Sequence, residues 1–405
     1  MPIVLAFNPG SNSLKFDIVD ARKDQTCAGE GRKVFTGAID NIGKETTAEL
    51  SRITSSGNQE LVSKKIDCKD FVAATEAIYN LLADPSLSQS GPPPRVEINA
   101  IRVVHGGNDF TGAVRFDNQV RTQIEKRQKL APLHNANSLR IAEGAQKHAP
   151  DIPIVVAFDT AFHHTIPEHA WRYPLPRDLA DKHGIRKFGF HGLSHRYMLE
   201  RYAQLAKRSV AEVSAVTLHL ESGSSACAIQ NGKSIDTSMG FTPLEGLMMG
   251  TRSGSIDPAI LPFLMEEEHL SAADTLNILE KKSGLLGVSG ISLDTRILRK
   301  RNEPAARQAI DIFAYKVRLY VGAYLAVLGK TEVVIFGGGI GENTPEVRNN
   351  VLDGLEGWAF VVDQQSNPKT MAGDARISHP SSPLAAWVIH SEEGLQIAHE
   401  SVQAL

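Results

Sequence analysis

The chain alternates short apolar segments that end at turn residues with longer segments in which apolar positions recur every three to four residues. The first pattern predicts β-strands and the second predicts α-helices. Expected strands cover residues 2–8, 14–19, 98–104, 152–158, 215–220, 225–230 and 331–336, and expected helices cover residues 70–83, 135–148, 194–208, 257–281 and 303–329. Strands that alternate with helices are typical of an α/β protein. The Gly- and Pro-rich segment 88–95 is expected to be a surface connector.

Two stretches far apart in the chain resemble each other. Residues 5–13, which read LAFNPGSNS, align without gaps on residues 218–226, which read LHLESGSSA. The alignment pairs Asn8 with Glu221 and a glycine with a glycine, so each stretch is an apolar strand, a polar residue, a glycine turn and a run of hydroxyls. Chance similarity over nine positions is one explanation. A duplicated fold is the better one.

Composition narrows the class of protein. The 405 residues are 42% hydrophobic, and the formal net charge of -3 comes with no extended basic patch. This predicts two domains of ordinary size and argues against binding of polymeric nucleic acid. Apolar runs fall short of the ~18 residues of a membrane span, and the first residues do not read as a signal peptide. Cysteine spacing also bears on the compartment, because Cys27, Cys68 and Cys227 are too widely spaced for a disulfide framework or a zinc site. From the apolar runs and the cysteines together, we expect a cytoplasmic protein that binds no membrane.

Two glycine turns are candidates for binding phosphate groups. The turn at Gly10 presents Ser11, Ser13 and Lys15, and it therefore offers backbone N–H groups, hydroxyls and a cation to a polyphosphate. For this turn alone, an ordinary β-hairpin with a Pro-Gly turn is the stronger interpretation. The matching turn at Gly223 favours phosphate binding, because two such turns could grip a nucleotide from both sides.

Two further glycine-rich segments add candidates. Residues 336–343, which read FGGGIGEN, follow an apolar strand and precede a helix expected to begin near Thr344, so a nucleotide could approach the backbone there. The segment is neither a Walker loop nor a complete dinucleotide fingerprint. Residues 239–254 are too irregular for a helix or strand, and long loops of this kind are often functional. Arg252 in this loop suits a phosphoryl group or a carboxylate, and a surface salt bridge is the alternative.

Several histidines lie at strand ends or glycine turns. They are His105, His134, His163, His164, His191 and His195. A single histidine is more often a hydrogen-bonded structural group, but this many at turns favours a pocket. His191 and His195 have the spacing of a helical metal pair, but Gly192 intervenes and the helix is expected to begin only after it.

Taken together, these segments resemble the acetate kinase family, in the superfamily of acetate and sugar kinases, heat-shock chaperones and actin. The matching segments follow the order of the family and are residues 8–15, 102–107, 131–135, 158–163, 188–195, 236–252 and 339–343. The resemblance implies a duplicated ribonuclease-H-like (actin-like ATPase) fold with an active-site cleft between two domains, and usually a homodimer. The first domain would comprise residues 1–150 and 386–405, and the second, residues 151–385, would carry most of the nucleotide site.

The resemblance also implies roles for individual residues. Arg102 and Arg252 would hold the carboxylate and the transferring phosphoryl group, and His191 would stabilise charge during transfer. Asp159 would be the acid/base or the orienting carboxylate, and His134 a supporting donor. Because a carboxylate substrate is already a nucleophile, no strong base is needed, and catalysis must come from positioning and charge neutralisation. We therefore expect Asp159 to orient Arg102 or Arg252 rather than to abstract a proton.

The binding residues implied by the resemblance fall into three groups. The apolar pocket for the substrate methyl group would comprise Val104, Leu133, Phe190 and Pro243. Mg²⁺ (or Mn²⁺) would bind at Asn8 and Glu392. ATP or ADP would contact Ser11, Ser13, Lys15, His219, Leu220, Glu221, Ser222, Gly223, Asp294, Thr295, Arg296, Gly339, Ile340, Gly341, Glu342 and Asn343.

The implied reaction is the reversible Mg-ATP-dependent phosphorylation of acetate to acetyl phosphate by direct in-line transfer. Two alternatives stay open. One is a kinase for propionate or another short acid, because a methylene in an apolar pocket separates substrates by only ~1–3 kcal/mol. The other is a nucleotide-binding relative with impaired transfer.

The chain departs from the family pattern mainly in the second turn. The family usually reads His-Leu-Gly-Asn-Gly there, whereas this chain has Glu221 and Ser222 before Gly223. A unit charge at ~5 Å from a phosphate and an effective dielectric of ~20 costs about 3 kcal/mol. Glu221 either recruits Mg²⁺ or impairs catalysis. Smaller departures are Asn12 for a serine and Ser255 for an aspartate.

Overall fold

The computed structural model describes residues 2–21, 31–54, 57–84, 93–128, 130–358, 360–363, 365–367 and 373–405. Cys27 and most of the expected connector 88–95 lie outside these residues. The chain forms two compact units. Unit 1 comprises residues 1–162, 192–201 and 392–405, and unit 2 comprises residues 163–191 and 202–391. The strand that follows residue 150 pairs within the sheet of unit 1, and the strand that contains residue 386 pairs within the sheet of unit 2. The expected domain bounds at residues 150 and 386 stay predictions.

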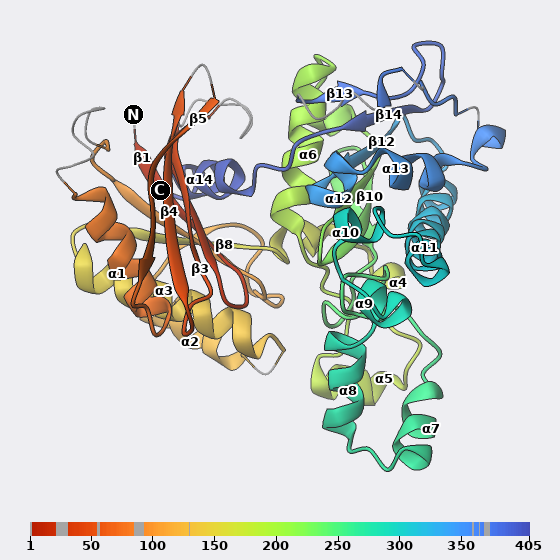
Figure 1. Cartoon of the computed structure of the whole chain (residues 1–405), viewed down its shortest axis with the longest axis horizontal. Helices are drawn as coiled ribbons and strands as arrows, with labels where there is room; N and C mark the ends of the chain where they lie inside the picture. Colours follow the sequence, from red (N-terminus) through yellow and green to blue (C-terminus); the bar gives the residue numbers. More distant parts are fainter. Residues whose placement is uncertain are drawn as a thin grey trace. The chain divides into compact units, whose positions relative to one another are not determined.

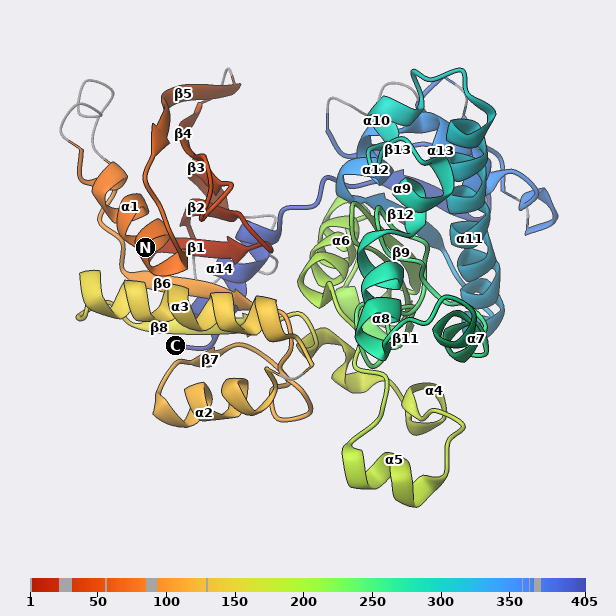
Figure 2. The same ribbon diagram turned by 60° about the horizontal axis from the view of Figure 1, so that its bottom comes forward.

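Unit 1 is built on an eight-stranded sheet with the order β5-β4-β3-β2-β1-β6-β8-β7. Its strands are β1 (Ile3–Pro9), β2 (Leu14–Asp20), β3 (Arg32–Asp40), β4 (Thr46–Thr54), β5 (Gly57–Ile66), β6 (Ile98–Val103), β7 (Val114–Arg115) and β8 (Ile154–Phe158). Its helices are α1 (Phe71–Leu82), α2 (Asn118–Lys126), α3 (Pro132–His148), α14 (Glu393–Gln403) and most of α6 (Gly192–Leu205). The last helix, α14, is grouped with unit 1. Helices α1 and α3 pack together on one side of this sheet and α14 on the other (Figures 1 and 2).

Unit 2 is built on a six-stranded sheet with the order β11-β10-β9-β12-β14-β13. Its strands are β9 (Ala215–Leu220), β10 (Ser224–Gln230), β11 (Lys233–Thr237), β12 (Val333–Gly337), β13 (Ala375–Arg376) and β14 (Ala385–Val388). Its helices are α4 (Glu168–Trp171), α5 (Arg177–His183), α7 (Ile260–Glu267), α8 (Ala272–Lys281), α9 (Gly284–Ser289), α10 (Thr295–Leu298), α11 (Pro304–Leu328), α12 (Gly338–Asn343) and α13 (Pro345–Leu352). The long α11 packs along this sheet (Figure 2), and residues of the helix and of the sheet together form the core of the unit.

The two sheets repeat one topology. In unit 1 the strand β1 pairs with β2 antiparallel and with β6 parallel, β6 pairs with β8 parallel, and β8 pairs with β7 antiparallel. In unit 2 the strands β9, β10, β12, β14 and β13 repeat the same neighbours in the same directions. The duplicated fold inferred from the internal repeat is therefore confirmed, with β4 and β5 as an extension of unit 1.

The repeat does not extend to each residue of the two turns. In the first hairpin, pairing ends at Pro9 and Leu14, so Gly10 begins a four-residue turn. In the second hairpin, pairing ends at Leu220 and Ser224, so Gly223 ends a three-residue turn. Asn8 consequently lies in a strand, whereas Glu221 lies in a turn. The gapless alignment therefore identifies the repeated hairpin correctly, but the residues that it pairs do not occupy equivalent positions in the two turns.

Alternation along the strands places the polar candidates on one face of each sheet. In unit 1, Leu5 and Phe7 of β1 and Ile101 of β6 belong to the core that includes α1 and α3. Successive side chains of a strand point to opposite faces, so Asn8 and Arg102 lie on the other face, where α14 begins. In unit 2, alternate residues of β9 belong to the core around α11, and the intervening residue His219 faces away from it.

Most expected elements are confirmed, and two differ. The expected helix 257–281 is two helices, α7 and α8, because Ser271 caps the second by accepting a hydrogen bond from the N–H of Asp274. The glycine stretch 338–343 is itself the short helix α12, and the next helix begins at Pro345. The strands β3, β4 and β5 were not expected, since their frequent charged residues hide the alternation that marks a strand. Among the described helices, none is long and apolar enough to cross a bilayer.

Candidate functional site

The candidate residues of unit 1 gather at the ends of β1, β6 and β8. Arg102 donates from Nε to Asp159 Oδ1 at 2.9 Å and from Nη2 to Oδ2 at 2.6 Å. Its third nitrogen, Nη1, donates to Asn8 Oδ1 at 2.7 Å and lies 3.4 Å from Glu393 Oε2. Such bidentate pairing fixes the plane of the guanidinium. Asp159 is buried, with 1% of its side chain exposed, and its two oxygens are occupied by one arginine. The structure thus pairs Asp159 with Arg102.

Oxygen donors for a divalent cation lie beside this arginine. Asn8 Nδ2 donates to Glu393 Oε2 at 2.6 Å. The sequence had indicated Glu392, whose carboxylate is bound by Lys33 instead. Glu393 was missed because the two glutamates are adjacent at the start of α14 and only the fold shows which one faces β1. Amide and carboxylate oxygens are the ligands that Mg²⁺ prefers, so the donor types fit, although the described residues contain no group of three carboxylate, histidine or cysteine ligands.

The first glycine turn is a hairpin turn with exposed polar side chains. The N–H of Gly10 donates to the carbonyl of Ser13 at 2.8 Å, which closes the turn. Ser11 and Lys15 are exposed, and Ser13 is half-buried. Lys15 forms no ion pair with the part of the chain that the structure describes. A hairpin and a phosphate site are therefore compatible here, because the turn leaves its hydroxyls and its cation accessible.

The loop after β6 is held by buried hydrogen bonds. Asn135 accepts from the N–H of His105 at 3.1 Å and donates to its carbonyl at 2.9 Å. Burial, with a smaller effect of Arg127, lowers the pKa of His105 to about 4, so its imidazole is neutral near pH 7. His105 is therefore a structural residue. His134 lies half-buried in the first turn of α3, Val104 is buried, and Leu133 is 59% exposed.

The candidate residues of unit 2 gather at the carboxyl end of β9. His191 has a left-handed backbone conformation with φ of 56°, which is rare for a residue other than glycine. Its Nδ1 lies 2.8 Å from the hydroxyl of Ser225, and its ring centroid lies 4.4 Å from that of His219. A methyl group built on Gly223 would lie 3.6 Å from His191 Nε2 and 3.5 Å from Arg252 Nη1. Gly223 thus leaves open the space beside a histidine and an arginine.

The strained backbone of His191 is supported by His163. Nε2 of His163 lies 3.0 Å from the carbonyl of Phe190, and Nδ1 lies 2.8 Å from the hydroxyl of Ser234. Burial, opposed weakly by the hydrogen bond to Phe190, lowers the pKa of His163 to about 4. His163 is therefore neutral and donates from Nε2 to the residue before His191. Phe190 itself is 1% exposed.

Arg252 is a partly buried cation without a carboxylate partner. Its Nη1 donates to the carbonyl of Pro243 at 3.3 Å and approaches the sulfur of Met249 at 3.6 Å. It forms no ion pair with any residue in the described ranges, and burial lowers its pKa, with a smaller opposing effect of Glu280. Ser255, which replaces the usual aspartate, instead accepts from the N–H of Gly246 at 3.0 Å. A partly buried, unpaired guanidinium favours an anionic ligand.

The glycine-rich helix α12 is bound by carboxylates of its own unit. The N–H of Gly338 donates to Glu342 Oε1 at 2.9 Å, and the N–H of Gly339 donates to Glu221 Oε1 at 3.2 Å. Gly338 has φ of 74°, and a Cβ there would lie 2.8 Å from the carbonyl of Leu220, so only glycine fits. Burial opposes ionisation of Glu342, but hydrogen bonds from His390, Ser391 and Gly338 hold its pKa below the usual range. The N–H groups of Gly338 and Gly339 thus donate within the unit, and nucleotide binding by residues 339–343 stays a prediction.

Three further predicted nucleotide contacts form a self-contained cap. Asp294 caps α10 by accepting from the N–H of Arg296 at 2.8 Å, and the Arg296 guanidinium donates to both oxygens of the same carboxylate. These hydrogen bonds, opposed by slight burial, lower the pKa of Asp294. Thr295 between them is buried. Asp294 and Arg296 line an open cavity of about 580 Å³ together with residues 297, 300 and 301.

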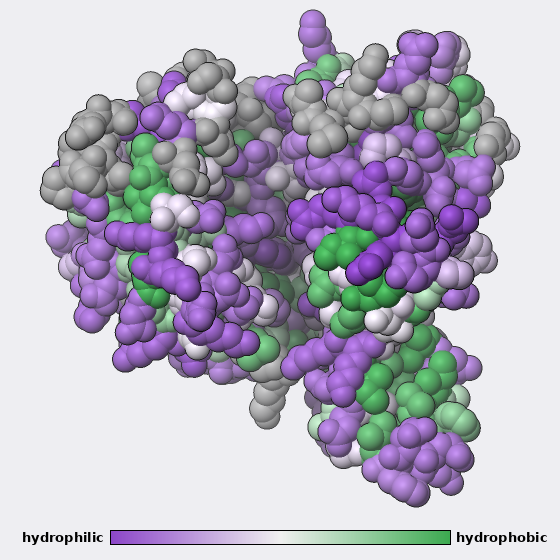
Figure 3. Space-filling model, in the orientation of Figure 1, coloured by the Kyte–Doolittle hydropathy of each residue, from purple (hydrophilic) through white to green (hydrophobic). Residues whose placement is uncertain are grey.

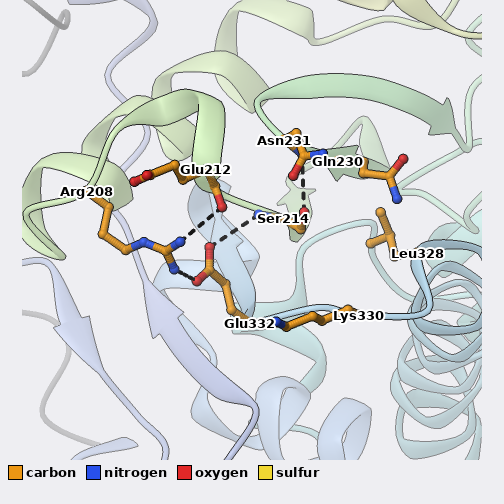
Figure 4. Close-up of a pocket in the computed structure, with 8 residues that line it drawn as sticks. All are labelled: Arg208, Glu212, Ser214, Gln230, Asn231, Leu328, Lys330 and Glu332. Atoms are coloured by element: carbon orange, nitrogen blue, oxygen red, sulfur yellow. Dashed lines mark hydrogen bonds and ion pairs between the residues drawn. The ribbon is translucent and has the colours of Figure 1, made fainter.

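A smaller cavity of about 240 Å³ lies at the opposite end of the unit 2 sheet (Figure 4). Ser214 and Glu332 in its wall directly precede β9 and β12, whereas the candidate residues follow these strands. Arg208 pairs with Glu332, and Glu332 accepts from the N–H of Ser214 at 3.2 Å. Arg208 and Glu332 thus pair across this cavity, which lies away from the candidate residues.

Comparisons with known proteins place the chain in a family. The model of the acetokinase family matches residues 3–399. The acetate kinase of Thermoanaerobacterium thermosaccharolyticum is 40% identical over 402 residues, which cover 98% of each chain, and that of Methanosarcina thermophila is 41% identical over 406 residues, which cover 98% of this chain and 96% of that one. Among solved structures, a Porphyromonas gingivalis acetate kinase matches with a TM-score of 0.89 and 36% identity, and a Francisella tularensis propionate kinase with 0.88 and 32%, each over 100% of both chains. The chain belongs to the acetokinase family.

Proposed function

We propose that this protein is an acetate kinase that catalyses the reversible reaction of acetate and ATP to acetyl phosphate and ADP. A carboxylate oxygen of acetate forms a bond to the γ-phosphorus, and the bond from that phosphorus to the β,γ-bridging oxygen breaks in line with it. No proton leaves the nucleophile. The protein must therefore neutralise charge and align two anions, which is the usual basis of phosphoryl-transfer catalysis.

The residues of unit 1 supply an oriented cation. Asp159 holds both edges of the Arg102 guanidinium, so Arg102 offers a fixed direction for binding an anion. With its oxygens engaged by Arg102, Asp159 serves as a positioning residue. Asn8, Glu392 and Glu393 are the residues we propose for Mg²⁺, which when bound neutralises phosphate charge. Lys15 and the hydroxyls of Ser11 and Ser13 are proposed phosphate contacts.

The residues of unit 2 supply a hydrogen-bond donor and a second cation. When the Ser225 hydroxyl donates to Nδ1 of His191, the proton of the imidazole lies on Nε2, the atom beside Gly223. That N–H can donate to a phosphoryl oxygen as its charge changes during transfer. Arg252 on the other side of Gly223 binds the anionic substrate groups. We propose the segments 219–223, 294–296 and 339–343 as the nucleotide contacts, with His219 and Glu221 among them.

One observation carries the proposal most directly: Arg252 is partly buried beside His191 and no carboxylate of the described chain pairs with it. An uncompensated guanidinium in such a position is destabilising unless an anion binds there. Acetate and the transferring phosphoryl group are both suitable anions. A pure nucleotide-binding protein would need Lys15 and the glycine turns but not this additional clamp.

Propionate is the second candidate acceptor. The observation in its favour is the fold match over the whole chain to a propionate kinase at 32% identity. The proposed methyl-binding residues are Val104, Leu133, Phe190 and Pro243, and His134 is a proposed supporting donor. Since an extra methylene changes binding by only ~1–3 kcal/mol, turnover has to be compared directly.

A coupled assay of ADP release with acids of two to five carbons tests the proposal. We expect kcat/KM for acetate to exceed that for propionate about tenfold or more, and turnover to require Mg²⁺. We expect Arg252→Gln to lower kcat/KM for acetate at least about 100-fold, whereas Arg307→Gln at an exposed position of α11 is the matched control. Equal or better turnover of the longer acids would reassign the substrate. Tight ATP binding without turnover of any acid would instead identify a nucleotide-binding relative.

We also propose that the protein acts in the cytoplasm as a homodimer. The free thiols of Cys68 and Cys227 suit a reducing compartment. Helix α7 reads ILPFLMEE, yet none of its residues is buried, and Phe263 is 60% exposed. Apolar side chains of α7 and the neighbouring α8 gather on one surface (Figure 3). A second copy of the chain, which carries the same apolar surface, would bury it in a symmetric dimer.

A further inference from the structure

Glu221 bridges two segments that we propose to contact the nucleotide. It lies in the turn 221–223, and its Oε1 accepts from the N–H of Gly339 at 3.2 Å, in the glycine-rich helix α12. Its other oxygen, Oε2, lies 4.0 Å from Nε2 of His219. A nucleotide that contacts both segments must therefore lie against this carboxylate.

The carboxylate is placed by the backbone as well as by its own hydrogen bond. Gly338 is so close to the second turn that a Cβ there would lie 2.9 Å from Cγ of Glu221. Within the turn, the hydroxyl of Ser224 donates to the carbonyl of Glu221 at 2.8 Å. With 47% of its side chain exposed, Glu221 carries its charge at the surface where solvent and ligand both reach it.

We infer that Glu221 acts as a charge filter for the phosphate donor, favouring the Mg²⁺ complex of a nucleotide over the metal-free nucleotide. A metal-free nucleotide carries two more negative charges than its Mg²⁺ complex, and each charge near Glu221 is repelled. The inference rests on the proposed kinase function. It names a specificity role for a residue that the reaction itself does not require.

A role for Glu221 as a ligand of Mg²⁺ is less consistent with these contacts. Oε1 already accepts the hydrogen bond from the N–H of Gly339, and Oε2 lies 4.0 Å from Nε2 of His219. Mg²⁺ requires near-octahedral oxygen coordination. The two roles predict opposite effects of removing the charge, which makes them separable by experiment.

Calorimetric titration of ADP, with Mg²⁺ and with a chelator, separates the roles in the wild-type chain, Glu221→Gln and Glu221→Gly. For a charge filter, Glu221→Gln keeps an acceptor for Gly339 but loses the repulsion, so affinity for metal-free ADP rises about tenfold or more and affinity for Mg-ADP rises less. The difference should shrink at high ionic strength. Glu268→Gln, at an exposed position beyond α7, is the control for charge removal elsewhere.

Three outcomes would overturn the inference. Weaker Mg-ADP binding with unchanged metal-free binding in Glu221→Gln would identify a metal ligand. If Glu221→Gln binds ADP and Mg-ADP like the wild-type chain, and Glu221→Gly binds both more weakly, Glu221 has a structural role only. An unchanged ratio of the two affinities in both variants would leave Glu221 without influence on the donor. Because binding is measured without turnover, absence of acetate phosphorylation in the wild-type chain would count against the proposed function and not against the filter.

Discussion

At the scale of single residues, Arg102 shows how much of a functional group is determined by its neighbours. The guanidinium has contacts to Asp159, Asn8 and Glu393, which come from three different elements of unit 1. A lysine has one ammonium group and cannot occupy both oxygens of Asp159 while also reaching Asn8. The direction of the cation, and not its charge alone, is what the site supplies.

Replacement of Arg102 by lysine tests this point. We expect Arg102→Lys to lower kcat at least about 100-fold, because the charge remains but its orientation is lost. Far-ultraviolet circular dichroism should stay unchanged. The exposed Arg95 provides the matched control, Arg95→Lys. Wild-type turnover of Arg102→Lys would contradict the orienting role of Asp159.

His163 predicts a loss of stability in acid. Its pKa is about 4 in the folded chain because of burial, against an ordinary value of 6.5. The unfolded chain therefore binds a proton that the folded chain does not, and stability is lost as pH falls from about 6.5 towards 4. A shift of this size corresponds to about 3 kcal/mol. Urea unfolding gives the free energy of unfolding at about pH 7 and about pH 5. We expect this free energy to fall less between the two pH values in His163→Gln than in the wild-type chain. In His183→Gln, at an exposed site, the fall should equal that of the wild-type chain.

At the scale of elements, α6 and α14 meet within unit 1 at a buried charge cluster. Arg196 of α6 pairs with Glu200 at 2.7 Å and with Glu400 of α14 at 3.1 Å. Gln396 also donates to Glu400 at 3.1 Å. Burial raises the pKa of Glu400, opposed by Arg196 and Gln396, and Glu200 adds to the rise. One arginine is thus shared by two buried carboxylates.

This cluster predicts a stabilising substitution. A carboxyl with a raised folded pKa binds its proton more tightly when folded, so its contribution to stability is lost as pH rises above the ordinary value of 4.5. We expect Glu400→Gln to raise the free energy of unfolding at about pH 8, and to raise it less at about pH 5. Glu143→Gln at an exposed position of α3 is the control. A pH-independent effect would show that charge at Glu400 is not the cause.

At the scale of the whole molecule, the apolar surface of α7 and α8 bears on assembly. Phe263, Ile260 and Leu276 are 60%, 40% and 45% exposed. A surface of this kind is normally covered in a soluble protein. Its position on helices that contribute little to the core of unit 2 fits a role outside the single chain.

Substitution of Phe263 tests the dimer. We expect Phe263→Ser to shift the mass measured by light scattering towards the monomer, since an aromatic side chain contributes strongly to an apolar interface. The exposed Tyr315 of α11 provides a control, Tyr315→Ser. A monomeric wild-type chain would refute the dimer, and a dimer that tolerates both substitutions would place the interface elsewhere.

The sequence alone determined the features that depend on neighbours along the chain. Hairpins such as β1–β2, the long α11, the glycine turns and the ordered motifs of the family follow from local patterns, because strand pairing across a tight turn and helix formation are local. The duplicated topology could also be predicted from the sequence, because both copies keep the same pattern of strand, turn and strand.

Only the tertiary structure decided which distant groups meet. Asn8 and Glu393 are 385 positions apart, and Glu221 and Gly339 are 118 apart, so no local pattern indicates these pairs. The positions of Glu393 beside Asn8, of Arg102 beside Asp159 and of Glu221 beside Gly339 all depend on strand register and helix placement. Packing sets these contacts. Once one face of a strand is buried in the core, its alternate side chains must lie on the opposite face, and these are the ones that meet.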